Sequence, residues 1–143
     1  MKAPLHRSRD GFTLIEIMMV VAIIMLLLGV AIYKMGGSLE AAKIARAHSD
    51  IKGLQASLVS YEAMAGSLPT TTQGLKALVE KPTSDPKPRN WTNLLDSVQK
   101  DPWGHEYIYE IPGKHKPGSY DLYSAGKDGQ SNTGDDVGNW QEL

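Results

Sequence analysis

The chain has 143 residues, with 15 basic and 16 acidic side chains and a formal net charge of −1. This even balance argues against a strongly basic face for nucleic acid. The absence of cysteine excludes a disulfide framework, and the length that follows the apolar N-terminal stretch suits one small domain rather than two.

Residues 12–33 are predicted to form a transmembrane helix, because Glu16 is the only charged side chain among them. A helix of this length extends roughly 33 Å at about 1.5 Å per residue, which is enough to cross a bilayer core. The residues before it are basic at Lys2, Arg7 and Arg9. By the positive-inside rule, we expect a single span with a cytoplasmic N-terminus and the remainder on the periplasmic side.

Gly11 stands directly before the apolar stretch, whereas a secretory signal has a shorter apolar core followed by a small-residue cleavage site. Cleavage after Gly11 would remove residues 1–11 and leave the apolar helix on the mature protein. Residues 11–16 read Gly-Phe-Thr-Leu-Ile-Glu. This order resembles the class III leader of type IV pilins and pseudopilins, in which a prepilin peptidase cuts after the glycine and N-methylates the new first residue. The resemblance implies cleavage after Gly11 and methylation of Phe12.

Glu16 requires a physical explanation, because an unpaired carboxylate in a spanning helix costs about 2.5 kcal/mol or more. One interpretation is that its carboxylate reaches water at the level of the lipid headgroups. The resemblance to pilins implies another, in which Glu16 pairs with the free α-amine of Phe12 on an adjacent subunit. Such a pair would favour the correct register in a filament, because an unpaired buried charge is costly.

Beyond the span, apolar residues recur in alternating steps of three and four, at Ile44, Ala47, Ile51, Leu54, Leu58, Tyr61 and Ala65. This spacing predicts an amphipathic helix that packs on the domain from Ile44 onward. No proline occurs in residues 12–65, so we expect one long helix with a flexible point at Gly36-Gly37 and a stop at Gly66. Its earlier part is expected to pack on other helices in a filament.

The remaining residues predict a small mixed domain. Capping threonines before residues 73–80 indicate a short helix, and residues 91–98 are expected to form another helical turn. Residues 106–111 and 119–124 alternate in the way of strands and flank a turn, which predicts an antiparallel hairpin. The fold class is therefore α+β, with a long N-terminal helix packed on a small C-terminal domain.

Within the hairpin, Tyr120, Leu122 and Ser124 alternate with Asp121 and Tyr123, which is typical of a strand. The histidines show no zinc-site spacing and are interpreted as surface residues, at His6, His48, His105 and His115. No nucleophile and base pair, phosphate loop or carboxylate dyad indicates catalysis, so we expect no enzymatic activity.

Three carboxylates, Asp128, Asp135 and Asp136, lie close together in a glycine-rich segment. Hard cations such as calcium take six to eight oxygen ligands in flexible geometry, which carboxylates, backbone carbonyls and water can supply. The segment lacks the ligand order of an EF-hand. On the residues alone, a solvated polar turn and a calcium site both remain open.

Both ends of the chain resemble the major pseudopilins of type II secretion systems. The resemblance is carried by the leader, by Asp-Pro-Trp-Gly at 101–104, by the hairpin and by the tail with its aspartates. It implies a type IV pilin-like fold with a calcium-binding loop. The side chains of Asp128, Asp135 and Asp136 and the main-chain oxygens of Ala125 and Gln130 would be the ligands. Calcium would then replace the missing disulfide.

The function implied by this resemblance is that of a structural subunit, which polymerises into a periplasmic pseudopilus and drives folded proteins across the outer membrane. Implied partners are further copies of the chain, minor pseudopilins, a prepilin peptidase, an inner-membrane platform with its ATPase, the secretin and the secreted proteins. Two alternatives stay open: a type IV pilin of a surface fibre, and a membrane-anchored calcium-dependent periplasmic enzyme or sensor.

Overall fold

The computed structural model describes residues 11–141, of which 34–36 are described by backbone alone. Its main element is a single helix, α1 (Leu14–Ala65), of 52 residues. The prediction of one long helix is confirmed. Gly66 ends it with a left-handed φ of 88°, which side chains disfavour, and its amide donates to the carbonyl of Glu62 over 2.8 Å. The leader residues 1–10 lie outside the described residues.

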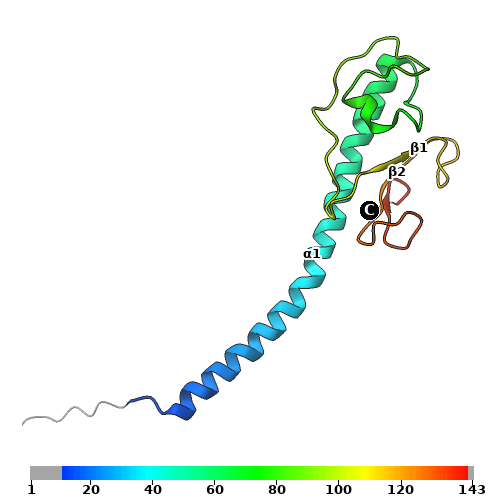
Figure 1. Ribbon diagram of the computed structural model, residues 1–143. Helices are drawn as coiled ribbons and strands as arrows, with labels where there is room; N and C mark the ends of the chain where they lie inside the picture. The colour runs from blue at the N-terminus through cyan, green and yellow to red at the C-terminus, as the bar shows by residue number, and fades with distance from the viewer. Residues whose placement is uncertain (1–10, 142–143) are drawn as a thin grey trace, which may run out of the picture. The chain divides into compact units, whose positions relative to one another are not determined.

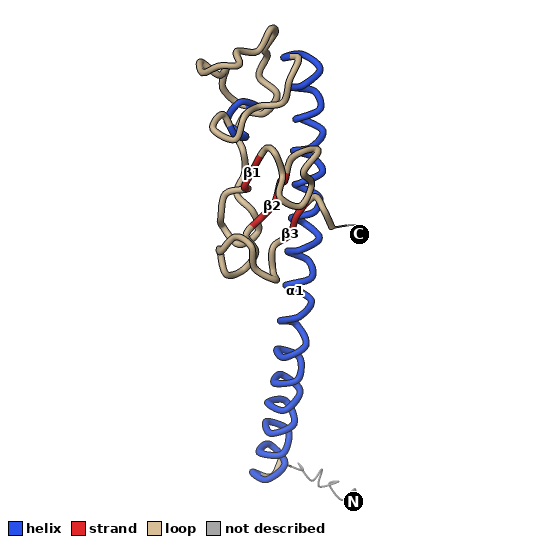
Figure 2. The backbone as a smooth tube through the Cα atoms, turned by 90° about the vertical axis from the view of Figure 1, so that its right-hand side faces the viewer, coloured by secondary structure: helices blue, strands red, loops and turns tan. Residues whose placement is uncertain are grey.

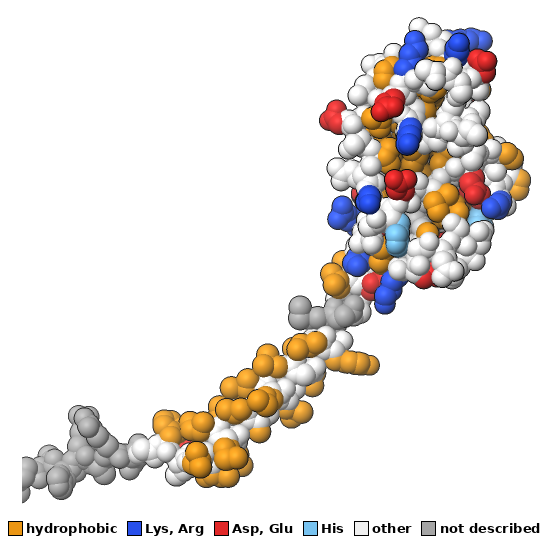
Figure 3. Space-filling model, viewed as in Figure 1, with side chains coloured by type: hydrophobic (Ala, Val, Ile, Leu, Met, Phe, Trp, Pro, Cys, Tyr) orange, Lys and Arg blue, Asp and Glu red, His pale blue; other side chains and the backbone are white. Residues whose placement is uncertain are grey.

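The chain divides after Glu40 into two compact units. In the N-terminal unit the apolar side chains of α1 surround the helix and are exposed (Figure 3). The most apolar window of the helix has a mean hydropathy of 2.9, and none of it is buried. By length and composition, α1 is the one described helix that could cross a membrane.

The C-terminal unit has its own hydrophobic core, built on the predicted stripe of α1. Every member from Ala47 to Ala65 is at most 8% exposed, whereas Ile44 is 38% exposed. The prediction is therefore wrong for Ile44, because the core begins one helical turn later. The core is completed by side chains from the short helix and the sheet described below, at Leu75, Ala77, Leu78, Tyr107, Tyr109, Tyr120, Leu122 and Val137.

The predicted short helix is a five-residue 3-10 helix, η1 (Gly74–Leu78). The helical turn expected at residues 91–98 is absent, and that prediction was wrong. There the amides of Leu94 and Leu95 donate to the carbonyl of Leu78, over 3.0 and 3.2 Å, and the indole of Trp91 donates to the carbonyl of Ala77 over 2.9 Å. These polar groups bond to the end of η1, so they are not available for a local helical turn.

Three antiparallel strands lie beside the C-terminal part of α1 (Figures 1 and 2). They are β1 (Ile108–Glu110), β2 (Asp121–Ser124) and β3 (Val137–Gly138), in the order β1-β2-β3. Tyr109 pairs with Leu122, so the predicted hairpin is confirmed. The strand β3 was not predicted, because two residues are too few to show an alternating pattern.

All four residues of β2 are buried, so both faces of this strand are covered. Asp121 is 1% exposed because its carboxylate caps the hairpin turn: Oδ2 accepts from the amides of Lys114 and His115, over 2.7 and 2.8 Å. Tyr123 is covered by Trp140, with 5.4 Å between ring centroids. Asp121 and Tyr123 are therefore buried by contacts with residues outside β2.

Asp121 is expected to make stability depend on pH. Burial would raise the pKa of its carboxyl group, but hydrogen bonds from His115, Lys116 and Lys114 outweigh burial and lower this pKa below its ordinary value. A carboxyl group with a lowered folded pKa stabilises the fold above its unfolded pKa, about 3.9, and this contribution is lost as pH falls through the folded value. Below about pH 4, the free energy of unfolding should therefore fall more steeply with acid in the parent than in Asp121→Asn.

Urea unfolding at about pH 5 and about pH 3 measures this difference. The exposed Asp96 has no described partner and provides the control, so Asp96→Asn should keep the parental slope. Equal slopes for the parent and Asp121→Asn would contradict the assignment.

Candidate metal centre and N-terminal assembly segment

The N-terminal segment begins with a capping box at the start of α1. The amide of Glu16 donates to Oγ1 of Thr13 over 3.3 Å, and the amide of Thr13 lies 3.5 Å from Oε2 of Glu16. Thr13 is thus the N-cap and Glu16 the third helical residue, which is the reciprocal arrangement that satisfies free amides at a helix start. Gly11 and Phe12 precede this cap and are exposed.

This arrangement gives Glu16 a partner within its own chain, which the sequence-based interpretation missed. The signal was present, because threonine followed three residues later by glutamate before an apolar run is a capping-box pattern. The expected contact between Glu16 and Phe12 of another subunit concerns an assembly and stays a prediction.

We expect Thr13→Val to loosen the first turn of α1, since loss of an N-cap hydroxyl typically costs about 1 kcal/mol. That energy corresponds to a roughly fivefold faster amide hydrogen exchange at Glu16, measured in detergent micelles. Thr13→Ser keeps the hydroxyl and should exchange like the parent. Identical exchange in the two variants would show that the capping bond does not hold the turn.

The acidic loop, defined here as residues 125–136, is anchored at its base by buried polar residues. The hydroxyl of Ser124, fully buried, donates to Oδ2 of Asp101 and accepts from the amide of Gly126 over 3.1 Å. Nδ1 of His105 lies 3.2 Å from the carbonyl oxygen of Gly126. Asp101 also accepts from the amide of His105 over 2.8 Å. The turn at 101–105 therefore fixes where the loop leaves β2.

A close backbone approach inside the loop requires glycine at position 126. Gly126 has a φ of 62°, and a Cβ atom there would lie 2.3 Å from the carbonyl oxygen of Asp135. Any other residue would both adopt a disfavoured conformation and displace the segment that carries the aspartates. The two ends of the acidic loop are thus held together by the backbone itself.

Four of the predicted ligand oxygens converge on one point, which is occupied by the hydroxyl of Thr133. Its Oγ1 lies 2.7 Å from Oδ1 of Asp135, 3.0 Å from the carbonyl oxygen of Gln130, and 3.4 and 3.5 Å from Oδ1 of Asp128 and Asp136. In the part of the chain that the structure describes, no group of three acidic or histidine side chains is arranged so that it could hold a metal ion. The four oxygens nevertheless all lie within 3.5 Å of one atom.

The backbone holds these carboxylates in orientation. Oδ2 of Asp135 accepts from the amides of Lys127 and Asp128, over 2.7 and 3.0 Å, and Oδ2 of Asp136 accepts from the amide of Asn132 over 2.8 Å. The hydrogen bond from Thr133, followed by that from the amide of Asp128, lowers the pKa of Asp135. Asp135 therefore favours the anionic form that binds cations.

The exposure of the predicted ligands differs. Asp128, Asp135 and Gln130 are exposed, whereas Asp136 and Ala125 are buried at 6% and 3% exposure. Ala125 follows β2 directly at the base of the loop. Thr133 was missed by sequence reasoning, since no spacing rule distinguishes one hydroxyl in a polar loop.

The described histidines differ in their exposure to solvent. His48 is only 8% exposed, so its assignment to the surface was wrong: its position on α1 faces the C-terminal segment. His105 is half-buried against the acidic loop, and His115 is exposed and stacks on Trp140 with 3.8 Å between centroids. His6 lies outside the described residues.

Comparison with known proteins gives consistent matches along the chain. Residues 34–140 match the family described as type II secretion system protein G, and residues 6–32 match the prokaryotic N-terminal methylation motif. The core protein G of Dickeya chrysanthemi is 42% identical over 95% of this chain and 89% of its own length. That of Pseudomonas aeruginosa is 42% identical over 94% of this chain and 97% of its own length.

A solved structure shows the same fold. The crystal structure of the major pseudopilin from the type 2 secretion system of enterohaemorrhagic Escherichia coli matches with a TM-score of 0.68 and 40% identity. The match covers 73% of this chain and 87% of that one.

Proposed function

Because the chain belongs to the protein G family of type II secretion systems and is a structural subunit of the secretion pseudopilus, we propose that it acts there as a calcium-stabilised filament subunit anchored in the inner membrane. The chain is assigned to this family because it matches a core protein G along nearly its whole length. The observation that supports calcium is the convergence of four oxygens on one point of the acidic loop.

Features of the N-terminal segment support the proposal that the leader is cleaved and that the apolar helix anchors the subunit in the membrane. The methylation motif covers residues 6–32, and the apolar helix that follows Phe12 is exposed in the isolated chain. In this proposal, a prepilin peptidase cuts after Gly11 and methylates the amine of Phe12. The helix then holds the subunit in the inner membrane, with its C-terminal unit in the periplasm.

Glu16 would serve assembly in addition to capping its own helix. Cleavage creates a cationic amine at Phe12, and its insertion beside the Glu16 carboxylate of an adjacent subunit would offset the cost of placing either charge in an apolar environment. The filament would therefore favour the one register in which each amine meets a carboxylate.

The residues of the acidic loop fit a hard cation, because its converging donors are all oxygens and three of them are carboxylates. Asp128, Asp135 and Asp136 would hold calcium by their side chains, with Gln130 and Ala125 contributing main-chain oxygens. Bound calcium would supply binding free energy that exists only in the folded state, as a disulfide does for other small domains. A subunit without it should be looser and should assemble poorly.

In the proposed cycle, an ATPase acts through an inner-membrane platform to add subunits, minor pseudopilins join the filament, and its growth moves folded proteins toward the secretin. A direct test is deletion of the gene in the source organism. Secreted proteins should then accumulate in the periplasm, and the parental gene, but not Glu16→Ala, should restore their release. Normal release from the deletion strain would refute the proposed role in export.

A further inference from the structure

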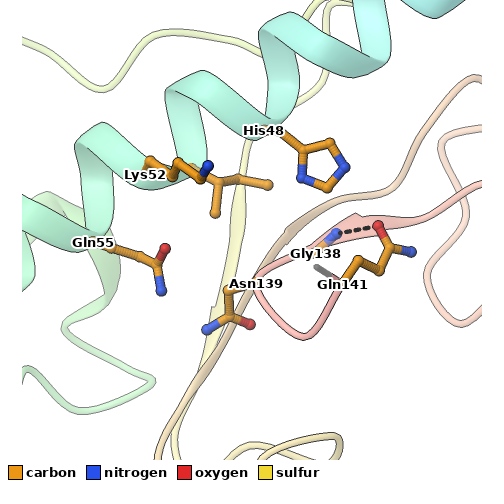
Figure 4. Close-up of a pocket in the computed structure, with 7 residues that line it drawn as sticks. His48, Lys52, Gln55, Gly138, Asn139 and Gln141 are labelled. Atoms are coloured by element: carbon orange, nitrogen blue, oxygen red, sulfur yellow. Dashed lines mark hydrogen bonds between the residues drawn. The ribbon is translucent and has the colours of Figure 1, made fainter. Parts of the chain in front are cut away.

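A small cavity lies between α1 and the C-terminal segment of the chain, apart from the acidic loop (Figure 4). Its volume is about 370 Å³. On one side it is lined by His48, Lys52 and Gln55 of α1, and on the other by Gly138, Asn139 and Gln141. Figure 4 shows these two groups facing one another across the opening.

His48 is the unusual member of this cavity. It is more than nine-tenths buried, its ring points from α1 toward Gly138, and no hydrogen bond or ion pair of its ring occurs among the residues that the structure describes. Among the described residues, every fully buried side-chain nitrogen or oxygen has a hydrogen-bond partner. The ring nitrogens of His48 are therefore open to the cavity, and none of its described lining residues bonds to them.

Lys52 lies one helical turn after His48, on the same face of α1, and likewise has no described partner. By contrast, the amide side chains opposite are already used: Asn139 donates to the carbonyl of Tyr120 over 3.0 Å, and Gln141 donates to that of Asp136 over 2.8 Å. No acidic side chain lines the described cavity wall. The groups left for a ligand are thus an ammonium and an imidazole, which favour a carboxylate.

We propose that this cavity binds a carboxylate side chain from a second copy of the chain, as a contact between subunits of the pseudopilus. The inference rests on the assembly of this family into a pseudopilus. It does not depend on calcium or on the role of Glu16, because neither the acidic loop nor the N-terminal segment lines the cavity.

The chain itself carries suitable carboxylates. Glu80 and Asp85 are exposed in the loop after η1 and have no side-chain partner among the described residues. In Figure 1 the green loop after η1 lies at the end where α1 terminates, and Figure 2 shows β3 farther back along the helix. Subunits displaced along a filament can therefore bring the loop of one copy to the cavity of another, while within one copy the two are separated.

Carbodiimide crosslinking of filaments of the full chain tests the contact, because it joins a lysine amine directly to a carboxyl group in contact with it. We expect a dimer in which Lys52 is linked to Glu80 or Asp85, as identified by mass spectrometry of the crosslinked peptides. The dimer should disappear in Lys52→Gln and persist in Lys81→Gln, which removes an exposed lysine outside the cavity. A crosslink from Lys52 to residues 142–143 of the same chain would overturn the proposal, as would filaments without any Lys52 crosslink.

Charge reversal provides a second test. Lys52→Glu should reduce the yield of sedimentable filaments about tenfold, because it replaces the proposed attraction between Lys52 and a carboxylate by repulsion. Combination with Glu80→Lys or Asp85→Lys should restore the yield for the true partner only. Lys81→Glu should assemble like the parent. If Lys52→Glu assembles normally while Glu16→Ala does not, the cavity contact is refuted and the role of the chain in the filament stands.

Discussion

Removal of calcium is expected to lower the melting temperature of a fragment of residues 41–143 by about 10–20 °C. A ligand present at about one hundred times its dissociation constant stabilises the folded state by about 2.7 kcal/mol. In a domain of this size, each kcal/mol corresponds to roughly 4–8 °C. The fragment contains the core of the C-terminal unit and the whole acidic loop, so its melting with calcium and then with a calcium-selective chelator reports on the site.

The same measurement identifies the ligands. Asp135→Ala should abolish the calcium-dependent rise, because Asp135 contributes the oxygen nearest the centre of the converging set, 2.7 Å from the Thr133 hydroxyl. Asp96→Ala removes an exposed carboxylate outside the loop and should retain the full rise. Equal melting of the parent and Asp135→Ala in calcium would remove Asp135 from the site. If calcium does not raise the melting temperature of the parent, the acidic loop is a polar turn and not a calcium site.

Gly11→Ala is expected to block leader removal almost completely and, with it, assembly. In the proposed processing, the peptidase would bind the backbone at this junction, and Gly11 lies in the non-helical segment directly before the cap of α1. The side chain added by alanine would meet the enzyme at the bond to be cut. Immunoblotting should show a precursor that is larger by the mass of residues 1–11, and Phe12 should stay unmethylated by mass spectrometry.

Gly37→Ala is the matched control for this experiment. Gly37 lies within α1, and a Cβ atom there would have no atom within 4 Å, so this variant should be processed like the parent. Normal processing of Gly11→Ala would count against cleavage at this junction. Failure of both variants would point to loss of membrane insertion rather than to the cleavage site.

Much of the fold could be predicted from local sequence patterns. The helix α1 could be predicted because residues 12–65 contain no proline and their apolar positions follow the helical period. The hairpin could be predicted because residues 106–111 and 119–124 each alternate in the way of strands and flank a turn. The aspartates could be selected as candidate ligands because carboxylates in a glycine-rich loop suit a hard cation. In each case the information lies within a short stretch of the chain.

Other features could not be predicted from local patterns because they depend on residues far apart in the chain. Residues 91–98 were expected to be helical, but the amides of Leu94 and Leu95 bond to the carbonyl of Leu78. Asp121 is a charged residue in a strand, but it is buried because its carboxylate caps the hairpin turn. His48 was assigned to the surface, but the segment of β3 covers it and forms a cavity with it.

The amino-acid sequence by itself determined the anchor, the long helix, the strand pair and the family, because hydrophobic periodicity and a short motif report on local structure and on ancestry. Only the tertiary structure decided that four predicted ligand oxygens meet at Thr133 and that His48 and Lys52 of α1 face a cavity with no acidic side chain among its described lining residues. Hydrogen bonds and burial connect residues that the sequence separates, so the partner of each polar group is settled only when the chain is folded.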